Sequence, residues 1–281
     1  MPALAWLAFS QGYPLVYSLF VSFQNWSLAS SDTPQGFIGF GNYLRVASDP
    51  QFQHGLLLSG FFVGSVAIEL VLGFALAYCS LGERRSLQLF RTLLIIPMVI
   101  APIAVGTLWR LLLDANSGLV NAVLSAVGLH GADWLGNQSS AIVSVIAVDV
   151  WEWIPFSMII YTAAMSGIDP ALLESARLDG ASPWRIIRHL LIPMLLPATL
   201  MICVFRVIDA FLVIDVVFSM TYGGPGFSTT TATLWTYNSG LKYFNMGEAS
   251  AASWLMLAVC LIIATALLGL RSRAERRSAG Y

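Results

Sequence analysis

The sequence contains few charged residues. Only 10% of its 281 residues are Asp, Glu, Lys or Arg, whereas an average soluble domain has about 25%. Lysine occurs once, at Lys242, and the net charge of -1 offers no basic surface for nucleic acid. Apolar residues make up 57% of the chain instead, with a mean hydropathy of +0.76. This composition excludes an ordinary soluble domain and predicts an all-α integral membrane protein.

Residues that carry catalytic or metal chemistry are also scarce. The cysteines lie in apolar stretches without CxxC or Cys/His spacing, and they read as small buried hydrophobes. The histidines lie outside the apolar stretches, and no HExxH, GxSxG or GxxxxGK[ST] motif occurs. These residues are Cys79, Cys203, Cys260, His54, His130 and His189. The sequence therefore gives little support to an intramembrane enzyme, and we expect no cofactor or metal bound by this chain.

Six apolar stretches are long enough to cross a bilayer, which takes roughly 20 residues. They cover residues 2–23, 56–81, 89–113, 141–165, 190–220 and 250–270. No basic segment precedes the first stretch and no A-x-A-like site follows it, so we expect no cleaved signal peptide. Pro193 and Pro197 predict that the fifth stretch begins as a cytosolic or interfacial helix and bends into the bilayer. We expect a single transmembrane domain over 1–281.

The basic residues predict the orientation of these spans. Ten of them fall in the second connection, the fourth connection and the tail: Arg84, Arg85, Arg91, Arg177, Arg185, Arg188, Arg271, Arg273, Arg276 and Arg277. The opposite loops hold Arg45 and Lys242, while Arg110 and Arg206 fall within or at the ends of spans. Because cytosolic loops are enriched in Lys and Arg, this bias predicts that both termini and the segment 167–192 are cytosolic.

The segment 167–192 has the signals of two short helices. Asp169 and Ser182 each precede a proline and provide an N-cap, and Gly180 can end the first helix in a left-handed conformation. In the second helix, Trp184, Ile187 and Leu191 are predicted to lie on one apolar face, and charged residues are predicted to lie on another face. One interpretation is an amphipathic helix that only anchors the loop to the membrane. The other is a helix–turn–helix that docks into another protein.

The spacing within this segment favours docking. Glu174-Ser175-Ala176, then Gly180 and, after nine residues, Leu190-x-Ile192-Pro193 resemble the EAA signature of bacterial ABC-importer permeases. Ser175 replaces an alanine, Leu190 and Ile192 exchange aliphatic types, and Asp179 precedes the glycine as in the common DGA form. The stretches 37–52, 222–226 and 241–253 are also similar to outer loops of the carbohydrate-uptake permeases. Within that family the chain resembles the maltose-system F subunit and the glycerol-phosphate-system A subunit.

The resemblance implies a type I ABC-importer permease fold in a bacterial inner membrane. It also implies partners: a second, different permease, two ATPase subunits that carry ATP and Mg²⁺, and an extracytoplasmic sugar-binding protein. The ATPase-coupling residues would be Glu174, Ser175, Ala176, Asp179, Gly180, Ala181 and Pro193. The solute would be a sugar, a polyol or a glycerol phosphate.

Polar residues inside the spans mark the candidate solute path, because such residues are costly in lipid. They include Glu69 and Asp149, and we expect substrate contacts from Trp151, Glu152, Trp153, Arg206, Asp209 and Asp215. Two alternatives stay open. Arg206 and Asp209, three residues apart, can simply pair with each other, and the tryptophans can anchor at the membrane interface.

An ion-coupled secondary transporter is the alternative function. Such carriers often contain inverted repeats, and no clear repeat occurs in this sequence. A secondary transporter would also leave the EAA-like segment unexplained. We therefore expect a transport subunit, not an enzyme, that takes its energy from a separate ATPase.

Overall fold

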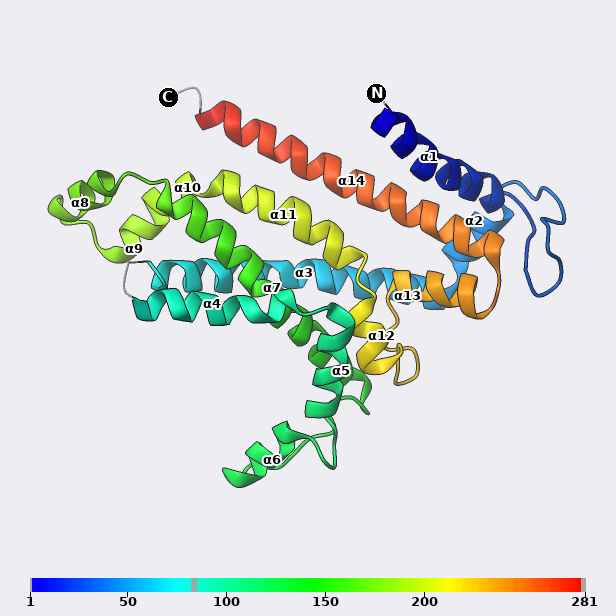
Figure 1. Ribbon diagram of the computed structural model, residues 1–281, viewed down its shortest axis with the longest axis horizontal. Coiled ribbons are helices and arrows are strands. Elements are labelled where there is room, and N and C mark those ends of the chain that lie inside the picture. Colours follow the sequence, from blue (N-terminus) through cyan, green and yellow to red (C-terminus); the bar gives the residue numbers. More distant parts are fainter. Residues whose placement is uncertain (1, 82–84, 279–281) are drawn as a thin grey trace.

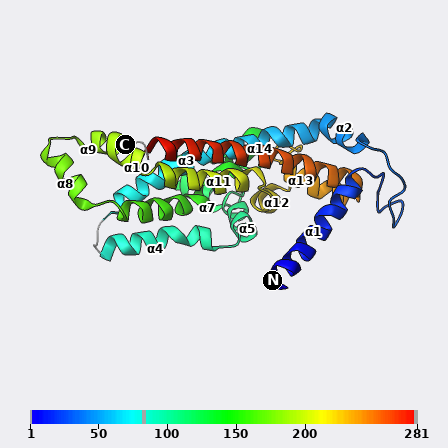
Figure 2. The ribbon, with the colours of Figure 1, turned by 90° about the horizontal axis from the view of Figure 1, so that it is seen from above.

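The computed structural model describes residues 2–81 and 85–278. Helices account for most of these residues, and the described chain contains no β-sheet beyond one isolated bridge between Gln24 and Phe37. The long helices lie side by side along the long axis of an elongated bundle (Figures 1 and 2). They are α3 (Pro50–Cys79), α4 (Arg85–Val99), α7 (Gln138–Ser166), α11 (Leu196–Phe211) and α14 (Met246–Ser278).

The shorter helices lie at the ends and on the flanks of this bundle. α8 (Pro170–Leu178) and α9 (Pro183–Ile186) occupy one end, α2 (Gly41–Ser48) and α13 (Ala232–Tyr237) the other (Figure 1). The other short elements are α6 (Leu119–Ala126), α10 (Ile192–Met194), α12 (Asp215–Thr221) and the π-helical turns Ile187–Leu191 and Asn238–Lys242. α1 (Pro2–Ser22) contacts α14 near the α2 end, and its N-terminal part turns away from the bundle (Figure 2).

α3 and α7 form the centre of the bundle. Asp49 begins α3 as an N-cap, because its carboxylate accepts hydrogen bonds from the backbone N–H groups of Gln51 at 2.8 Å and Phe52 at 2.9 Å. Close approach to α7 requires Gly73, since a Cβ there would lie 2.5 Å from Cβ of Ser157. The apolar core follows this pair along its length, including Leu58, Phe62 and Val145 towards the α13 end and Met158 and Tyr161 towards the α8 end.

Two of the expected spans are broken helices. Within 89–113, α4 and α5 (Pro102–Leu112) are separated at Ile100–Ala101 and meet at 98°. Proline has no N–H to donate and forces the preceding residue towards extended geometry, which Ala101 adopts with φ -61° and ψ 133°. Within 190–220, the helical runs Pro183–Met194 and Leu196–Phe211 meet at 64°, with the bend at Leu195 between Pro193 and Pro197.

A second break in the 190–220 stretch had not been expected. The chain leaves helical geometry at Leu212–Ile214 before α12 begins. By length and composition, α3, α7 and Met246–Gly269 can each cross a membrane, and the two bent pairs raise the number of described crossings to as many as five. α1 falls outside that group, so six crossings stay a prediction.

The described basic residues of the connections separate between the two ends. α4 begins at Arg85, α14 ends at Ser278, and both points lie at the end that carries α8 and α9 (Figures 1 and 2). α2, which contains Arg45, lies at the opposite end (Figure 1), and the π-helical turn that ends at Lys242 follows and contacts α13 there. Arg84 lies outside the described residues. The connections and the tail whose basic residues predict a cytosolic location therefore lie at the same end of the molecule.

Candidate functional site

The first candidate site is the segment 167–192, which projects from one end of the bundle as a folded helix–turn–helix (Figure 1). Asp169 caps α8 by accepting a hydrogen bond from Ala171 N–H at 2.9 Å, and Ser182 caps α9 through Arg185 N–H at 3.4 Å. Both caps are followed by a proline in the first turn. The local signals of the sequence therefore correspond to real ends of helices.

The turn between the two helices depends on Gly180. Its φ of +77° lies in the left-handed region that disfavours other residues. Gly180 N–H donates to the carbonyl of Arg177 at 3.0 Å, and Ala181 N–H donates to that of Ala176 at 3.0 Å, which satisfies the last carbonyls of α8. The side chains of Ala176 and Ala181 pack towards the apolar core at this end. These small residues thus set the shape of the segment.

The outer surface of the segment combines charged and apolar side chains. Leu178 is 88% exposed and Trp184 67% exposed. Pro193 lies in α10, where the segment rejoins the bundle. The charged or ionisable members are all exposed, and no described residue forms an ion pair with any of them: Asp169, Glu174, Arg177, Asp179, Arg185, Arg188 and His189. Ser175 is also exposed and bonds only within α8, to the carbonyl of Leu172. A surface of this composition suits contact with another protein.

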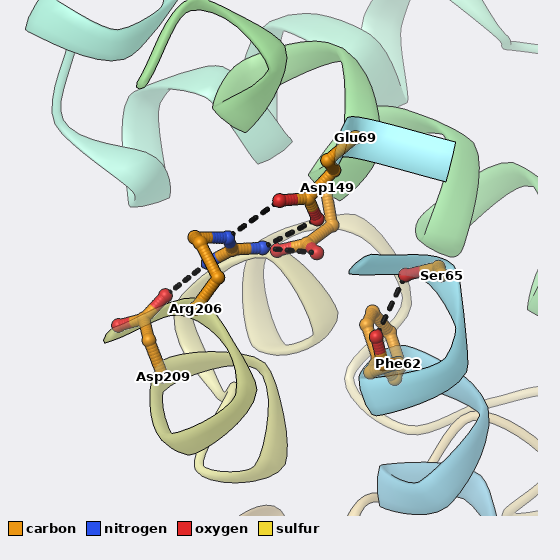
Figure 3. A network of polar contacts seen from close by, with 6 residues as sticks. All are labelled: Phe62, Ser65, Glu69, Asp149, Arg206 and Asp209. Carbon is orange, nitrogen blue, oxygen red and sulfur yellow. Dashed lines mark hydrogen bonds and ion pairs between the residues drawn. The ribbon is translucent and has the colours of Figure 1, made fainter. Parts of the chain in front are cut away.

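The second candidate site is a cluster of buried charges in the middle of the bundle (Figure 3). Arg206 of α11 is 1% exposed, and its guanidinium donates to both carboxylate oxygens of Glu69 of α3, Nε–Oε2 at 2.7 Å and Nη2–Oε1 at 2.8 Å. Nη2 also donates to Oδ2 of Asp149 of α7 at 3.0 Å, and Nη1 pairs with Asp209. One arginine thus connects three long helices through a bidentate pair and two single contacts.

Aromatic and acidic neighbours complete the surroundings of this arginine. The ring of Trp153 lies 4.5 Å from the guanidinium carbon, within the range of a cation–π contact. Glu152 is 1% exposed, and its Oε2 has no hydrogen-bond partner among the described residues. Because a buried carboxyl oxygen without a donor is costly, Glu152 calls for a functional explanation.

A cavity of about 350 Å³ opens beside this cluster. We call it the inner cavity. The break between α11 and α12 forms one wall, and the start of α5 contributes Pro102. Its lining residues are Pro102, Asp149, Trp153, Val204, Phe205, Ile208, Asp209, Leu212, Val213, Ile214, Asp215 and Val216. The unexpected break at Leu212–Ile214 therefore helps to form a mostly apolar hollow whose wall includes three aspartates.

The predicted path residues divide into three groups. Trp153, Asp209 and Asp215 line the inner cavity. Arg206 and Glu152 are buried next to it and are absent from its lining. Trp151 lies elsewhere, with its ring 5.3 Å from that of Trp109 in α5. The pairing of Arg206 with Asp209, expected from their spacing, is present.

The sequence marks Glu69 as a candidate for the solute path but does not identify its partner. It was recognised as an intramembrane carboxylate, but its partner lies 137 residues away in the chain. Phe205 and Pro102 were not expected in the site either, and nothing in their local sequence indicates a cavity. Only the intramembrane position of Glu69 offered a signal.

Comparison with known proteins gives consistent relationships. Residues 56–277 match the family described as binding-protein-dependent transport system inner membrane component. A probable ABC transporter permease protein, y4oQ of Sinorhizobium fredii, is 36% identical over 95% of this chain and 87% of that protein. The trehalose/maltose transport system permease protein MalF of Thermococcus litoralis is 30% identical over 86% of this chain and 81% of that protein.

A solved structure has the same fold. It belongs to a bacterial ABC transporter involved in the import of the acidic polysaccharide alginate, and its matching chain superimposes with a TM-score of 0.85. The match covers 97% of this chain and 93% of that chain at 23% identity. At this identity the likeness concerns the fold.

Proposed function

The chain belongs to the family of binding-protein-dependent transport system inner membrane components and is a permease subunit of an ABC transporter, and we propose that it imports a sugar. The observation that carries the coupling part of the proposal is the exposed helix–turn–helix at 167–192, whose charged groups have no ion-pair partner among the described residues. The sugar assignment is supported by the relative that is named as a trehalose/maltose permease.

The proposed energy source is a separate ATPase. The sequence has no GxxxxGK[ST] motif, whose backbone amides and lysine would hold nucleotide phosphates. In our proposal two ATPase subunits bind ATP and Mg²⁺ and dock on the segment 167–192. Glu174 would meet a cationic group of the ATPase, and Gly180 would keep α8 and α9 at the angle that fits its surface. The end with α8 and α9 would then face the cytosol, as the basic residues predict.

The solute would pass through the bundle beside the Arg206 cluster. Trp153, Asp209 and Asp215 would contact it from the wall of the inner cavity. A second, different permease subunit would complete the path, and an extracytoplasmic binding protein would deliver the solute at the α13 end. The solved alginate transporter was crystallised with an alginate-bound periplasmic protein, which supports this type of assembly.

Charge reversal at Glu174 tests the coupling. We expect Glu174→Lys to insert normally into the membrane but to lose co-purification with the ATPase and ATP-driven uptake, because an interfacial charge pair becomes a like-charge contact. Asp32→Lys is the matched control, since Asp32 is also exposed and lies in the loop 23–40 at the opposite end. Unchanged ATPase association in Glu174→Lys would contradict the docking role.

The geometry of the turn gives a second test. Gly180→Leu places a branched side chain at φ +77°, whereas Gly180→Asn substitutes a residue that tolerates left-handed geometry. We expect uptake to fall strongly with leucine and much less with asparagine. Equal uptake by the Gly180→Leu and Gly180→Asn variants would show that coupling does not depend on the left-handed geometry at Gly180.

Depletion of ATP separates this proposal from a secondary transporter. Cells that keep a proton gradient but lack ATP should stop importing the solute if the chain is part of an ABC importer. Continued uptake under those conditions would instead support ion-coupled transport.

A further inference from the structure

The lining of the inner cavity is acidic. Asp149, Asp209 and Asp215 line it, and none of its described lining residues is a lysine, an arginine or a histidine. Asp209 is the most accessible member of the Arg206 cluster, because its side chain is 54% exposed. A solute that enters this cavity therefore meets carboxyl groups and aromatic rings.

Arg206 is not available to balance a negative solute. Its Nε, Nη1 and Nη2 already donate to Glu69, Asp209 and Asp149 respectively. The face of its guanidinium is covered by Trp153 at 4.5 Å. Four of its five N–H groups are therefore used within the chain, and at 1% exposure the arginine offers almost no surface to an incoming carboxylate or phosphate.

Glu152 adds a further acceptor next to the cavity. It lies one helical turn from Asp149 on α7, is 1% exposed, and has an unpartnered Oε2. Arg206 is the cation of the cluster near this group, and it is already paired with Glu69, Asp149 and Asp209. A solute that supplies hydrogen-bond donors therefore matches the carboxyl groups at and beside the cavity.

We propose that the inner cavity selects an uncharged, hydroxyl-rich solute and rejects anionic ones such as uronates and phosphate esters. This inference rests on the proposed function and narrows its substrate class. Hydroxyl groups donate to the carboxyl oxygens of Asp209 and Asp215, and the apolar faces of a sugar ring pack on Trp153 and Phe205. An anionic group would lie close to the carboxyl groups of Asp209 and Asp215, and like charges near a protein surface repel more strongly than in bulk water.

The proposal separates this chain from its fold neighbour. That structure belongs to an importer of an acidic polysaccharide, whereas the acidic lining described above is suited to a neutral sugar. It also removes glycerol phosphates from the solutes that the sequence had left open.

Binding of a matched pair of probes tests the selectivity. Trehalose and trehalose 6-phosphate share both rings and differ in one phosphate. Their affinities are measured by equilibrium binding to the assembled permease–ATPase complex without the binding protein, so that the selectivity comes from the membrane subunits. We expect trehalose to bind at least about tenfold more tightly than its phosphate ester, because rejection of the anion is built into the site.

Removal of the carboxylate charges of the cavity then tests whether the cavity causes this ratio of affinities. In the double variant Asp209→Asn, Asp215→Asn the preference should fall several-fold through stronger binding of the phosphate ester. Asp32→Asn, an exposed carboxylate of the loop 23–40, should leave the ratio unchanged. An unaltered ratio in the double variant, or equal binding of both probes by the wild type, would overturn the inference while leaving the ABC-permease assignment intact. Binding of neither probe, together with no ATP-driven uptake of neutral sugars, would contradict the sugar assignment and the inference with it.

Discussion

The segment 167–192 and the Arg206 cluster differ in the exposure and in the ion pairing of their charged side chains. In the segment, the charged side chains are exposed and no described residue pairs with them. In the cluster, Arg206 and Glu69 are 1% and 0% exposed, and each of the three ion pairs of Arg206 lies within the chain. The charged side chains of the segment 167–192 are therefore available to a partner protein, whereas those of the Arg206 cluster join helices of the same chain.

The physical cost of charge explains the difference. An exposed ion keeps its water, so it can remain unpaired at little cost until a partner arrives. A buried ion has lost its water and needs a partner with good geometry at all times. Substitutions should therefore affect stability in the cluster and association in the segment.

The largest effect is expected from Arg206→Met. The replacement removes the cation and leaves Glu69 and Asp149 buried without a partner, which should lower the free energy of unfolding by about 3–5 kcal/mol. Thermal unfolding of the purified protein in detergent measures the loss. Arg206→Lys is the control, because it keeps the charge but cannot reproduce the bidentate contact, and it should lose less. A stable Arg206→Met variant would show that the cluster does not hold the bundle together.

A double-mutant cycle between Glu69 and Arg206 sharpens the assignment. We expect an interaction free energy of about 1–3 kcal/mol from Glu69→Gln, Arg206→Met and the double variant, because residues in one ion-pair network are not additive. Glu69→Gln combined with Glu174→Gln serves as the matched pair from the two regions and should be additive. Additivity between Glu69 and Arg206 would mean that their contact contributes nothing measurable.

The same contrast explains how much could be predicted. The ends of α8 and α9 follow from Asp169, Ser182 and Gly180, since a cap acts on backbone groups two or three residues away. The pair Arg206–Asp209 follows from its spacing on one helix. Signals of this kind are local, so the candidate docking segment could be derived almost completely from the sequence.

The cluster and its cavity could not be derived in this way. The contact between Glu69 and Arg206 depends on how three helices pack, and no local rule connects residues 137 positions apart. Pro102 lies at the break between α4 and α5, but the presence of a proline gives no direction for the 98° bend. The break at Leu212–Ile214 contains no proline or glycine, and so the sequence offered no sign of it.

Gly180 should show an intermediate effect on stability. Gly180→Leu forces a side chain into left-handed geometry, which costs about 1–2 kcal/mol. A Cβ at this position would meet no other atom within 4 Å, so the cost comes from the backbone alone. Gly180→Asn should therefore recover most of the loss in thermal unfolding. Equal destabilisation by both residues would indicate a packing role for Gly180 that its open surroundings do not show.

Glu174→Lys should have the smallest effect on stability and a large effect on association. Because the side chain is exposed and no described residue pairs with it, the free energy of unfolding should change by no more than about 0.5 kcal/mol. Thermal unfolding and ATPase co-purification are measured on the same preparation, with Asp32→Lys as the control for surface charge. Arg206→Met should give the reverse pattern, with a large loss of stability. If Glu174→Lys instead destabilises the chain as Arg206→Met does, its carboxylate is part of the internal structure, and the docking interpretation of the segment 167–192 fails.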